Sequence, residues 1–304
     1  MDTIRHNFIW RKTAQTFEPV KRNTMTTNPL LKTMKIGFIG AGNMTQALVK
    51  GLTESQIIKP DHIFVSNRTH GKLLKMSEAY KVQTKNHNEE VVENCDIVVL
   101  ATKPQDLQEA LEPVANHFQD HQIIISLAAG IPTSTLEKVI PHGRIIRLMP
   151  NTPSLIGRGI IGYYFQNKEN NDIISDYMNE LFSHLGMVIK VESEEQLETL
   201  MISCSSGTGF VFEMMLYWQD WIQEHGFPEE VAKKMTIETF LGASLLAAQS
   251  NGINIEELQA RVASKKGVTS AGLNSMRELE IERALRISFE KAGLRSQEIS
   301  KTFK

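Results

Sequence analysis

Short apolar runs alternate with helical stretches over the first half of the chain. The runs cover residues 35–40, 62–66, 96–101, 122–127 and 144–149. Apolar residues at helical spacing fall between them, as at 43–52 and 107–117. Strands that are apolar along their whole length are typical of a parallel sheet covered by helices on both faces. The pattern therefore predicts an α/β fold with a doubly wound parallel sheet.

After about residue 195 the periodicity becomes helical throughout. The predicted helices cover residues 195–209, 211–225, 228–250, 255–262 and 271–292. With the boundary near 192–196, we expect a first domain at 34–194, an all-helical domain at 195–295 and a flexible tail at 296–304. Residues 1–33 are basic, and we interpret them as a disordered extension. A transit peptide, or an upstream start before Met34, is the alternative.

Composition narrows the function. The formal net charge of −2 gives no electrostatic reason to expect nucleic acid as a partner. No uninterrupted apolar stretch reaches the roughly 18 residues of a membrane span, so no membrane partner is expected. Cys95 and Cys204 lack metal-ligand spacing, and His117 and His121 make only a chance HxxxH. We therefore predict no metal and a cytoplasmic protein.

A glycine-rich turn follows the first predicted strand. Ile39 ends this strand, and the turn then reads Gly40, Ala41, Gly42, Asn43, Met44, with Thr45 where a third glycine is common. The first glycine permits a tight turn, and the second lets the backbone approach a pyrophosphate at the start of the next helix. In this position the motif predicts a Rossmann-like dinucleotide site.

The end of the second predicted strand indicates which dinucleotide is bound. Enzymes that use NAD usually place a carboxylate there for the ribose hydroxyls. This chain instead has Asn67, Arg68 and Thr69. The two neutral side chains offer hydrogen bonds, and Arg68 offers a cation to a 2′-phosphate. We therefore predict NADPH as the preferred cofactor, with NADH as an alternative.

Several segments together resemble the pyrroline-5-carboxylate reductase family. They are M-K-I-G-F-I-G-A-G-N-M at 34–44, A-T-K-P-Q at 101–105, S-L-A-A-G-I at 126–131, R-L-M-P-N-T-P at 147–153 and S-K-K-G-V-T-S-A-G-L at 264–273. The resemblance spans roughly residues 34–295. It implies hydride transfer from NADPH to the C=N bond of 1-pyrroline-5-carboxylate, which gives L-proline. It also implies a homodimer or larger homo-oligomer held together by the helical domain.

The resemblance also implies roles for particular residues. The substrate carboxylate is expected at Ser264, Gly267, Val268 and Thr269, and the Thr269 hydroxyl is expected to bond the ring nitrogen as the catalytic group. On the cofactor side, the resemblance adds Asn88, Thr102, Lys103, Pro104 and Asn151. A polar loop before a helix suits a carboxylate, because free N–H groups and the helix dipole converge there.

The chain departs from the family pattern in this loop. Lys265 and Lys266 replace proline and glycine, and Val268 replaces threonine. A glycine at 266 would fit a backbone with positive φ, which lysine tolerates poorly. A non-catalytic paralogue is therefore one alternative. A β-hydroxyacid dehydrogenase is another, but residues 213–217 lack the lysine that such an enzyme places on this helix.

Overall fold

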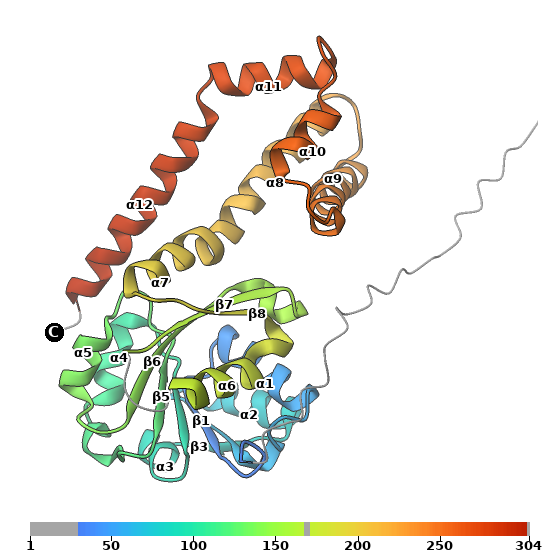
Figure 1. Cartoon of the computed structure of the whole chain (residues 1–304). Helices are drawn as coiled ribbons and strands as arrows, with labels where there is room; N and C mark the ends of the chain where they lie inside the picture. The colour runs from blue at the N-terminus through green and yellow to red at the C-terminus, as the bar shows by residue number, and fades with distance from the viewer. Residues whose placement is uncertain (1–29, 167–170, 303–304) are drawn as a thin grey trace, which may run out of the picture.

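A computed structural model describes residues 30–166 and 171–302 (Figure 1). Its centre is one eight-stranded sheet in the order β3-β2-β1-β4-β5-β6-β7-β8. Neighbouring strands are parallel except for β6 and β7, which are antiparallel. The bounds are β1 Ile36–Ile39, β2 Ile63–Ser66, β3 Gln83–Lys85, β4 Ile97–Leu100, β5 Ile123–Ser126, β6 Arg144–Pro150, β7 Gly159–Tyr164 and β8 Gly186–Lys190. The predicted doubly wound fold and all five predicted strands are confirmed.

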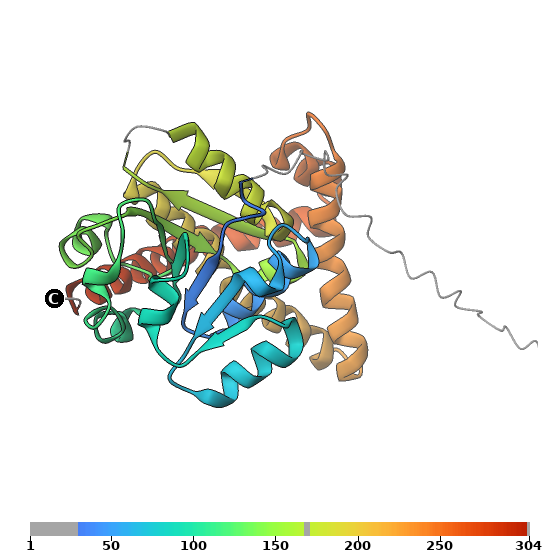
Figure 2. The ribbon, with the colours of Figure 1, turned by 90° about the horizontal axis from the view of Figure 1, so that it is seen from below.

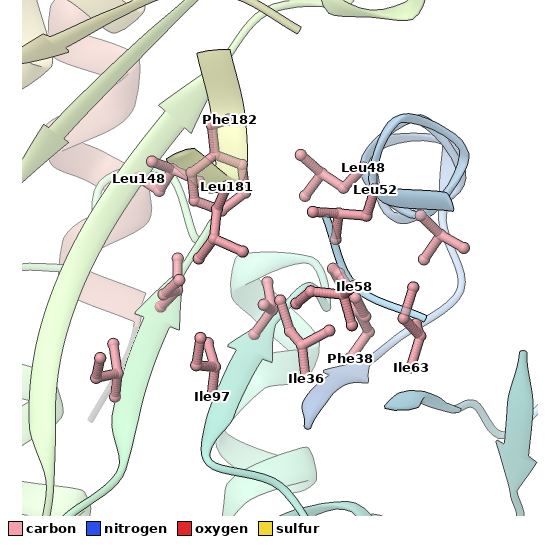
Figure 3. Close-up of a cluster of buried hydrophobic side chains, with 14 of the residues drawn as sticks. Ile36, Phe38, Leu48, Leu52, Ile58, Ile63, Ile97, Leu148, Leu181 and Phe182 are labelled. Atoms are coloured by element: carbon pink, nitrogen blue, oxygen red, sulfur yellow. The ribbon is translucent and has the colours of Figure 1, made fainter. Parts of the chain in front are cut away.

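Helices cover both faces of this sheet (Figures 1 and 2). They are α1 Asn43–Glu54, α2 His70–Tyr80, α3 Asn88–Val92, α4 Pro104–Leu111, α5 Thr133–Val139 and α6 Asn171–Phe182. One face forms the core shown in Figure 3, where Ile36 and Phe38 of β1 pack with Leu48 of α1 and Phe182 of α6. The opposite face buries Ile39 and residues of α3 and α4. The predicted helix at 107–117 differs, because α4 ends at Leu111.

The second half of the described chain is helical, as predicted. A continuous helix runs through α7 Glu194–Leu200, a π-helical segment Met201–Ser206 and α8 Gly207–Glu224. It is followed by α9 Glu229–Gln249, α10 Ile255–Val262, α11 Val268–Glu278 and α12 Ile281–Thr302. The predicted break at residue 210 is absent. The helix predicted over 271–292 is two helices, because the chain turns at Glu280 with a φ of 51°.

The helical half projects away from the sheet and then returns to it (Figure 1). Helix α8 leads outward, α10 and α11 lie at the far end, and α12 brings the chain back beside α5. Ser296 of α12 is buried, and its backbone carbonyl lies 2.7 Å from where a Cβ would stand on Gly130. The tail predicted from residue 296 is therefore wrong as far as Thr302, because this stretch is the packed end of α12.

The start of the described residues also differs from the prediction. Residues 30–33 form a turn, and the Leu31 side chain is fully buried in the main core. Residues 30–33 are therefore not part of a disordered extension, because Leu31 packs in the core. The remaining calls for residues 1–29 and 303–304 lie outside the described residues.

A buried arginine joins the sheet to the helical half. Arg147 of β6 is 1% exposed, and its guanidinium lies 2.5 Å from Glu198 and 3.6 Å from Glu194 of α7. The other oxygen of Glu198 accepts the Ser296 hydroxyl of α12 at 2.7 Å. Glu194 also accepts the backbone N–H and hydroxyl of Thr133, at 2.7 and 2.6 Å. This network connects β6, α5, α7 and α12.

The continuous helix Glu194–Glu224 is apolar enough, by length and composition, to cross a membrane. Its best 18-residue window has a mean hydropathy of 1.2, and only 6% of that window is buried. The sequence predicted helices here but no possible membrane span, because polar residues such as Ser203 and Thr208 interrupt the apolar runs. A single helix of this kind is weak evidence for a membrane, since an exposed interface helix has the same composition.

Candidate functional site

A pocket lies at the carboxyl ends of β1, β2 and β4. In a doubly wound sheet, ligands bind where the strand order reverses, which here falls between β1 and β4. The pocket is lined by residues that follow each strand: Ile39, Gly40, Ala41, Gly42, Asn67, Arg68, Thr69, Ala101, Thr102 and Lys103. The structure therefore brings together most of the residues predicted to bind a dinucleotide.

The two glycines of the turn have different spatial requirements. Gly40 has a φ of +112°, and an added Cβ would stand 2.7 Å from the carbonyl oxygen of Ala101. Gly42 has an ordinary extended backbone, and nothing lies within 4 Å of an added Cβ. Gly40 is thus needed for the turn itself, whereas Gly42 leaves open space on the pocket side. Such a cradle fits the close approach of a pyrophosphate.

Thr45 explains how the turn forms without a third glycine. Its side chain is fully buried, and its hydroxyl donates to the carbonyl oxygen of Gly40 at 2.8 Å. The bond ties the first turn of α1 to the end of β1. At the helix start, Gly42 is the N-cap, with no side-chain cap among the described residues. The first N–H groups of α1 therefore remain suited to an anion.

The asparagines predicted to bind cofactor are already bonded within the protein. Asn67 accepts the N–H of Ala41 at 3.2 Å and donates to the Thr69 carbonyl at 3.3 Å. Asn88 accepts the Ser66 hydroxyl at 2.8 Å and donates to the Ala110 carbonyl at 3.1 Å. Both side chains line the pocket. These hydrogen bonds hold both asparagines in the pocket wall. They leave fewer free donors and acceptors for a ligand.

Thr102 and Lys103 lie where β4 leads into α4. Within residues 30–166 and 171–302, the buried Thr102 hydroxyl has no hydrogen-bond partner. An unpaired buried hydroxyl carries a free-energy cost, and a bound ligand could supply the missing bond. Lys103 is exposed at the N-cap of α4, and Pro104 is the first residue of that helix. Thr102 thus lines the pocket, but a ligand would reach its hydroxyl only after the pocket wall moves, because that oxygen is buried.

Four predicted cofactor residues are not among those that line this pocket. Asn43 and Met44 begin α1, and Pro104 begins α4. Asn151 is 5% exposed; its amide accepts the Ile160 N–H at 2.8 Å and donates to the Cys204 carbonyl at 3.2 Å. Both ends of this amide are occupied, so Asn151 holds β7 and the π-helical segment against the end of β6.

The predicted substrate loop lies far from the pocket in the same chain. Residues 264–267 lie between α10 and α11, and 268–269 begin α11, at the end of the helical half most distant from the sheet (Figure 1). Among the described residues, none of this loop lines the pocket. Gly267 is the N-cap of α11, so Val268 and Thr269 lie in its first turn rather than before it. The helix was predicted to begin near Ala271, because the small polar residues ahead of it have weak helical preference.

The backbone of the loop has the conformation that its sequence predicted. Lys266 has a φ of 61°, in the region that favours glycine. The N–H of Gly267 donates to the Ser264 carbonyl at 2.9 Å, and α11 starts with no side-chain cap in the described chain. The loop thus offers free N–H groups at a helix start beside Lys265 and Lys266, which suits a carboxylate.

Two acidic residues and one lysine of the pocket were not predicted. Asp106 and Glu109 of α4 lie three residues apart on one helix face, and Lys72 comes from α2. Helical spacing alone could have placed the two carboxylates together, but nothing in the sequence indicated that this face meets Arg68. The Arg68 guanidinium lies 3.0 Å from both carboxylate oxygens of Glu109 and 3.7 Å from Asp106.

Metal and cysteine chemistry gain no support here. Over the described residues, no group of three or more His, Cys, Asp or Glu side chains could hold a metal ion. Cys95 is buried behind β1, and burial raises the pKa of its thiol to about 12. A thiol with that pKa stays protonated at neutral pH and is a poor nucleophile.

A substitution at Gly42 separates binding from folding. Gly42→Ala should weaken the binding of NADPH by about tenfold or more, because its methyl group would occupy the space left for the pyrophosphate. The melting temperature should change little, since the new Cβ meets no protein atom. Titration calorimetry and thermal unfolding measure the two quantities. Gly71→Ala, equally uncrowded but in α2 outside the pocket, is the matched control, and equal losses in both variants would contradict the assignment.

Comparison with known proteins gives a consistent picture. Residues 35–130 match the family described as NADP oxidoreductase coenzyme F420-dependent, and residues 194–299 match pyrroline-5-carboxylate reductase dimerisation. Over 274 residues, the chain is 32% identical to pyrroline-5-carboxylate reductase 2 of Bacillus subtilis (strain 168), covering 88% of this chain and 96% of that protein.

Two solved structures are similar over most of the chain. A pyrroline-5-carboxylate reductase from Coxiella burnetii is 30% identical with a TM-score of 0.79, covering 88% of this chain and 99% of the other. Plasmodium falciparum pyrroline carboxylate reductase, solved with NADP bound, is 24% identical with a TM-score of 0.79, covering 89% and 99%. At that identity the Plasmodium likeness supports the fold alone.

Proposed function

The chain belongs to the pyrroline-5-carboxylate reductase family, and on that premise we propose that it reduces 1-pyrroline-5-carboxylate to L-proline with NADPH. The observation that carries this proposal is the pocket at the β1–β4 switch point, with its glycine cradle at Gly40 and Gly42. Formation of L-proline from 1-pyrroline-5-carboxylate and NADPH by the purified protein is the test.

In this reaction the nucleotide pocket would bind NADPH and the loop before α11 would bind the substrate. NADPH, when bound, supplies the hydride, which forms the new C–H bond as the C=N π bond breaks. The ring nitrogen of a protonated imine keeps its proton. The electron pair of the broken π bond becomes the lone pair of the amine. The residues at the start of α11 would hold the substrate carboxylate, and the Thr269 hydroxyl would bond the ring nitrogen. Orientation, rather than a strong acid, is then the main contribution of the protein.

A second copy of the chain is needed to complete this site. In one chain, the loop before α11 lies at the end of the helical half that is far from the sheet (Figure 1), and among the described residues none of 264–269 lines the nucleotide pocket. The helical half between them exposes large apolar side chains on three helices: Phe212, Leu216, Trp218 and Trp221 of α8, Val231, Met235 and Leu246 of α9, and Ile281, Leu285 and Leu294 of α12. Apolar surface on this scale marks an interaction site. We propose a homodimer or larger homo-oligomer in which one subunit brings its loop to the pocket of another.

A single charge should disrupt this assembly. Trp221 is 61% exposed on α8, so Trp221→Glu should not disturb the fold of one chain. Burying a carboxylate in the interface should weaken association at least about 100-fold and abolish reductase activity. Light scattering across a concentration series measures the change in mass. Leu74→Glu, which is 52% exposed on α2 outside the helical half, is the control and should remain associated.

The same assembly accounts for the apolar helix Glu194–Glu224 without a membrane. We propose that its exposed side chains meet another subunit, and that the protein is cytoplasmic, with no nucleic-acid or membrane partner. The net charge of −2 and the buried, unpaired Cys95 support this assignment. Trp221→Glu tests this proposal too. If the helix crossed a membrane, the substitution would change the affinity of the protein for lipid and would leave the mass of the assembly unchanged.

A further inference from the structure

Arg68 does not lie alone at the edge of the nucleotide pocket. Its guanidinium Nη1 contacts both oxygens of Glu109 at 3.0 Å, and Nη2 lies 3.7 Å from Asp106. The two acids are three residues apart on α4, so the same helix face presents both of them to the end of β2. All three side chains line the pocket. The cation expected to select a 2′-phosphate therefore has a carboxylate partner already.

This arrangement changes the electrostatics of cofactor choice. A 2′-phosphate that carries about −1.5 to −2 charges would meet Arg68 and Lys72, but also Asp106 and Glu109. The pocket lining holds three cations, Arg68, Lys72 and Lys103, against these two carboxylates, so the acids reduce its net charge to +1. A phosphate must compete with Glu109 for the guanidinium and is repelled by the displaced carboxylate. The unphosphorylated ribose of NADH meets neither penalty.

Glu109 also supplies what β2 lacks. Enzymes that use NAD place a carboxylate near the ribose hydroxyls, usually at the end of the second strand. Here that position holds neutral Asn67 and cationic Arg68, whereas Glu109 reaches the same edge of the pocket from α4. A carboxylate at this edge can accept hydrogen bonds from a ribose diol.

We propose that Glu109 sets the cofactor selectivity of this chain: by pairing with Arg68 it lowers the preference for the 2′-phosphate and allows NADH to be used beside NADPH. This inference rests on the proposed function, since it concerns the nucleotide of the same reaction. Asp106 acts in the same direction but more weakly, because it lies farther from the guanidinium. Glu109 is thus a specificity-determining residue and takes no part in hydride transfer.

The experiment compares two ligands that differ only in the phosphate. Calorimetry would measure the affinity of 2′-phospho-ADP-ribose and of ADP-ribose for the wild-type protein, Glu109→Gln, Asp106→Asn and the control Glu112→Gln. Glu112 lies just beyond α4, is exposed and does not line the pocket in the described chain. Glu109→Gln should raise the ratio of phosphorylated to unphosphorylated affinity about three- to tenfold. Asp106→Asn should raise it less, and Glu112→Gln should leave it unchanged.

The outcomes separate this inference from the proposed function. If the wild-type protein binds neither ligand, the nucleotide assignment itself fails. If it binds both and Glu109→Gln leaves the ratio unchanged, or shifts it toward ADP-ribose, the role of Glu109 is overturned. The change in this affinity ratio on Glu109→Gln should also be smaller at high salt, because salt screens the interaction between exposed charges. The ratio of kcat/KM for NADPH over NADH should follow the same trend, and equal melting temperatures exclude a folding effect.

Discussion

Arg147→Met should lower the free energy of unfolding by about 3 kcal/mol, the largest stability change expected from a single substitution in this chain. Methionine keeps much of the apolar volume but leaves Glu194 and Glu198 without the cation between them. Both carboxylates are about three-quarters buried, so water replaces the guanidinium only in part. Because Glu198 also accepts the Ser296 hydroxyl of α12, the contact of this helix with the sheet should loosen too. Chemical denaturation monitored by circular dichroism measures the change.

A compensating variant shows whether charge is the cause. Adding Glu194→Gln and Glu198→Gln to Arg147→Met removes the unpaired negative charges and should recover at least half of the lost stability. The exposed ion pair of Arg286 and Glu282 on α12 provides a control, since Arg286→Met should leave the free energy of unfolding nearly unchanged. Equal losses at Arg147 and Arg286, or no recovery in the triple variant, would contradict this account of the network.

Thr269→Ala should lower kcat for reduction of 1-pyrroline-5-carboxylate about 100-fold, the largest change in activity expected from a single substitution that preserves both the fold and the assembly. The lost hydroxyl would no longer bond the ring nitrogen as the C=N bond is reduced. Thr269 is exposed in the first turn of α11, so stability should change little. Affinity for NADPH should stay at the wild-type value, because the predicted cofactor pocket is formed without this residue.

Two further variants sharpen this prediction. Thr269→Ser keeps a hydroxyl and should retain most of the activity, whereas Thr269→Val keeps the shape and should not. At NADPH concentrations below the dissociation constant of Gly42→Ala, mixing Thr269→Ala subunits with Gly42→Ala subunits should restore activity above either variant alone, because some mixed pairs combine an intact loop with an intact pocket. Unchanged turnover in Thr269→Ala would remove Thr269 from the reaction, and the absence of any recovery on mixing would contradict a site shared between subunits.

The strands were predictable where burial dictates the sequence, whereas their order in the sheet comes from the structure. β1, β4 and β5 are covered on both faces, so their apolar runs are uninterrupted. β3 is a three-residue edge strand with the sequence Q-T-K, which carries no apolar signal. β7 and β8 sit beyond β6, and an antiparallel pairing such as β6 with β7 is set by the turn at 152–157 rather than by strand composition.

The nucleotide pocket was predictable because it is local in sequence. Gly40 and Gly42 lie in one turn, and Arg68 ends the neighbouring strand. The partner of Arg68 was not predictable, because Glu109 is separated from it by 41 positions and reaches it only through the packing of α4. Asn151 differs from Glu109, because the motif that contains it was recognised in the sequence. Only the structure shows that its side-chain amide bonds the backbone of Ile160 and Cys204.

The substrate loop was predictable in conformation but not in location. The departure at Lys266 indicated a position with positive φ, and the backbone there has a φ of 61°. Nothing in a single sequence shows that α11 stands far from the pocket of its own chain, because that distance depends on how α8 and α12 extend from the sheet (Figure 1). The match to a dimerisation family and the exposed apolar helices both support the proposal that a second subunit meets this loop.

Steady-state turnover by the purified wild-type protein tests the central claim most directly. With NADPH and 1-pyrroline-5-carboxylate present together, we predict NADPH oxidation that saturates with the imine and forms one L-proline for each NADPH consumed. Omitting either reactant should abolish the reaction. Binding of NADPH without its oxidation, under conditions where the protein is associated, would contradict the reductase assignment and identify the chain as a nucleotide-binding paralogue.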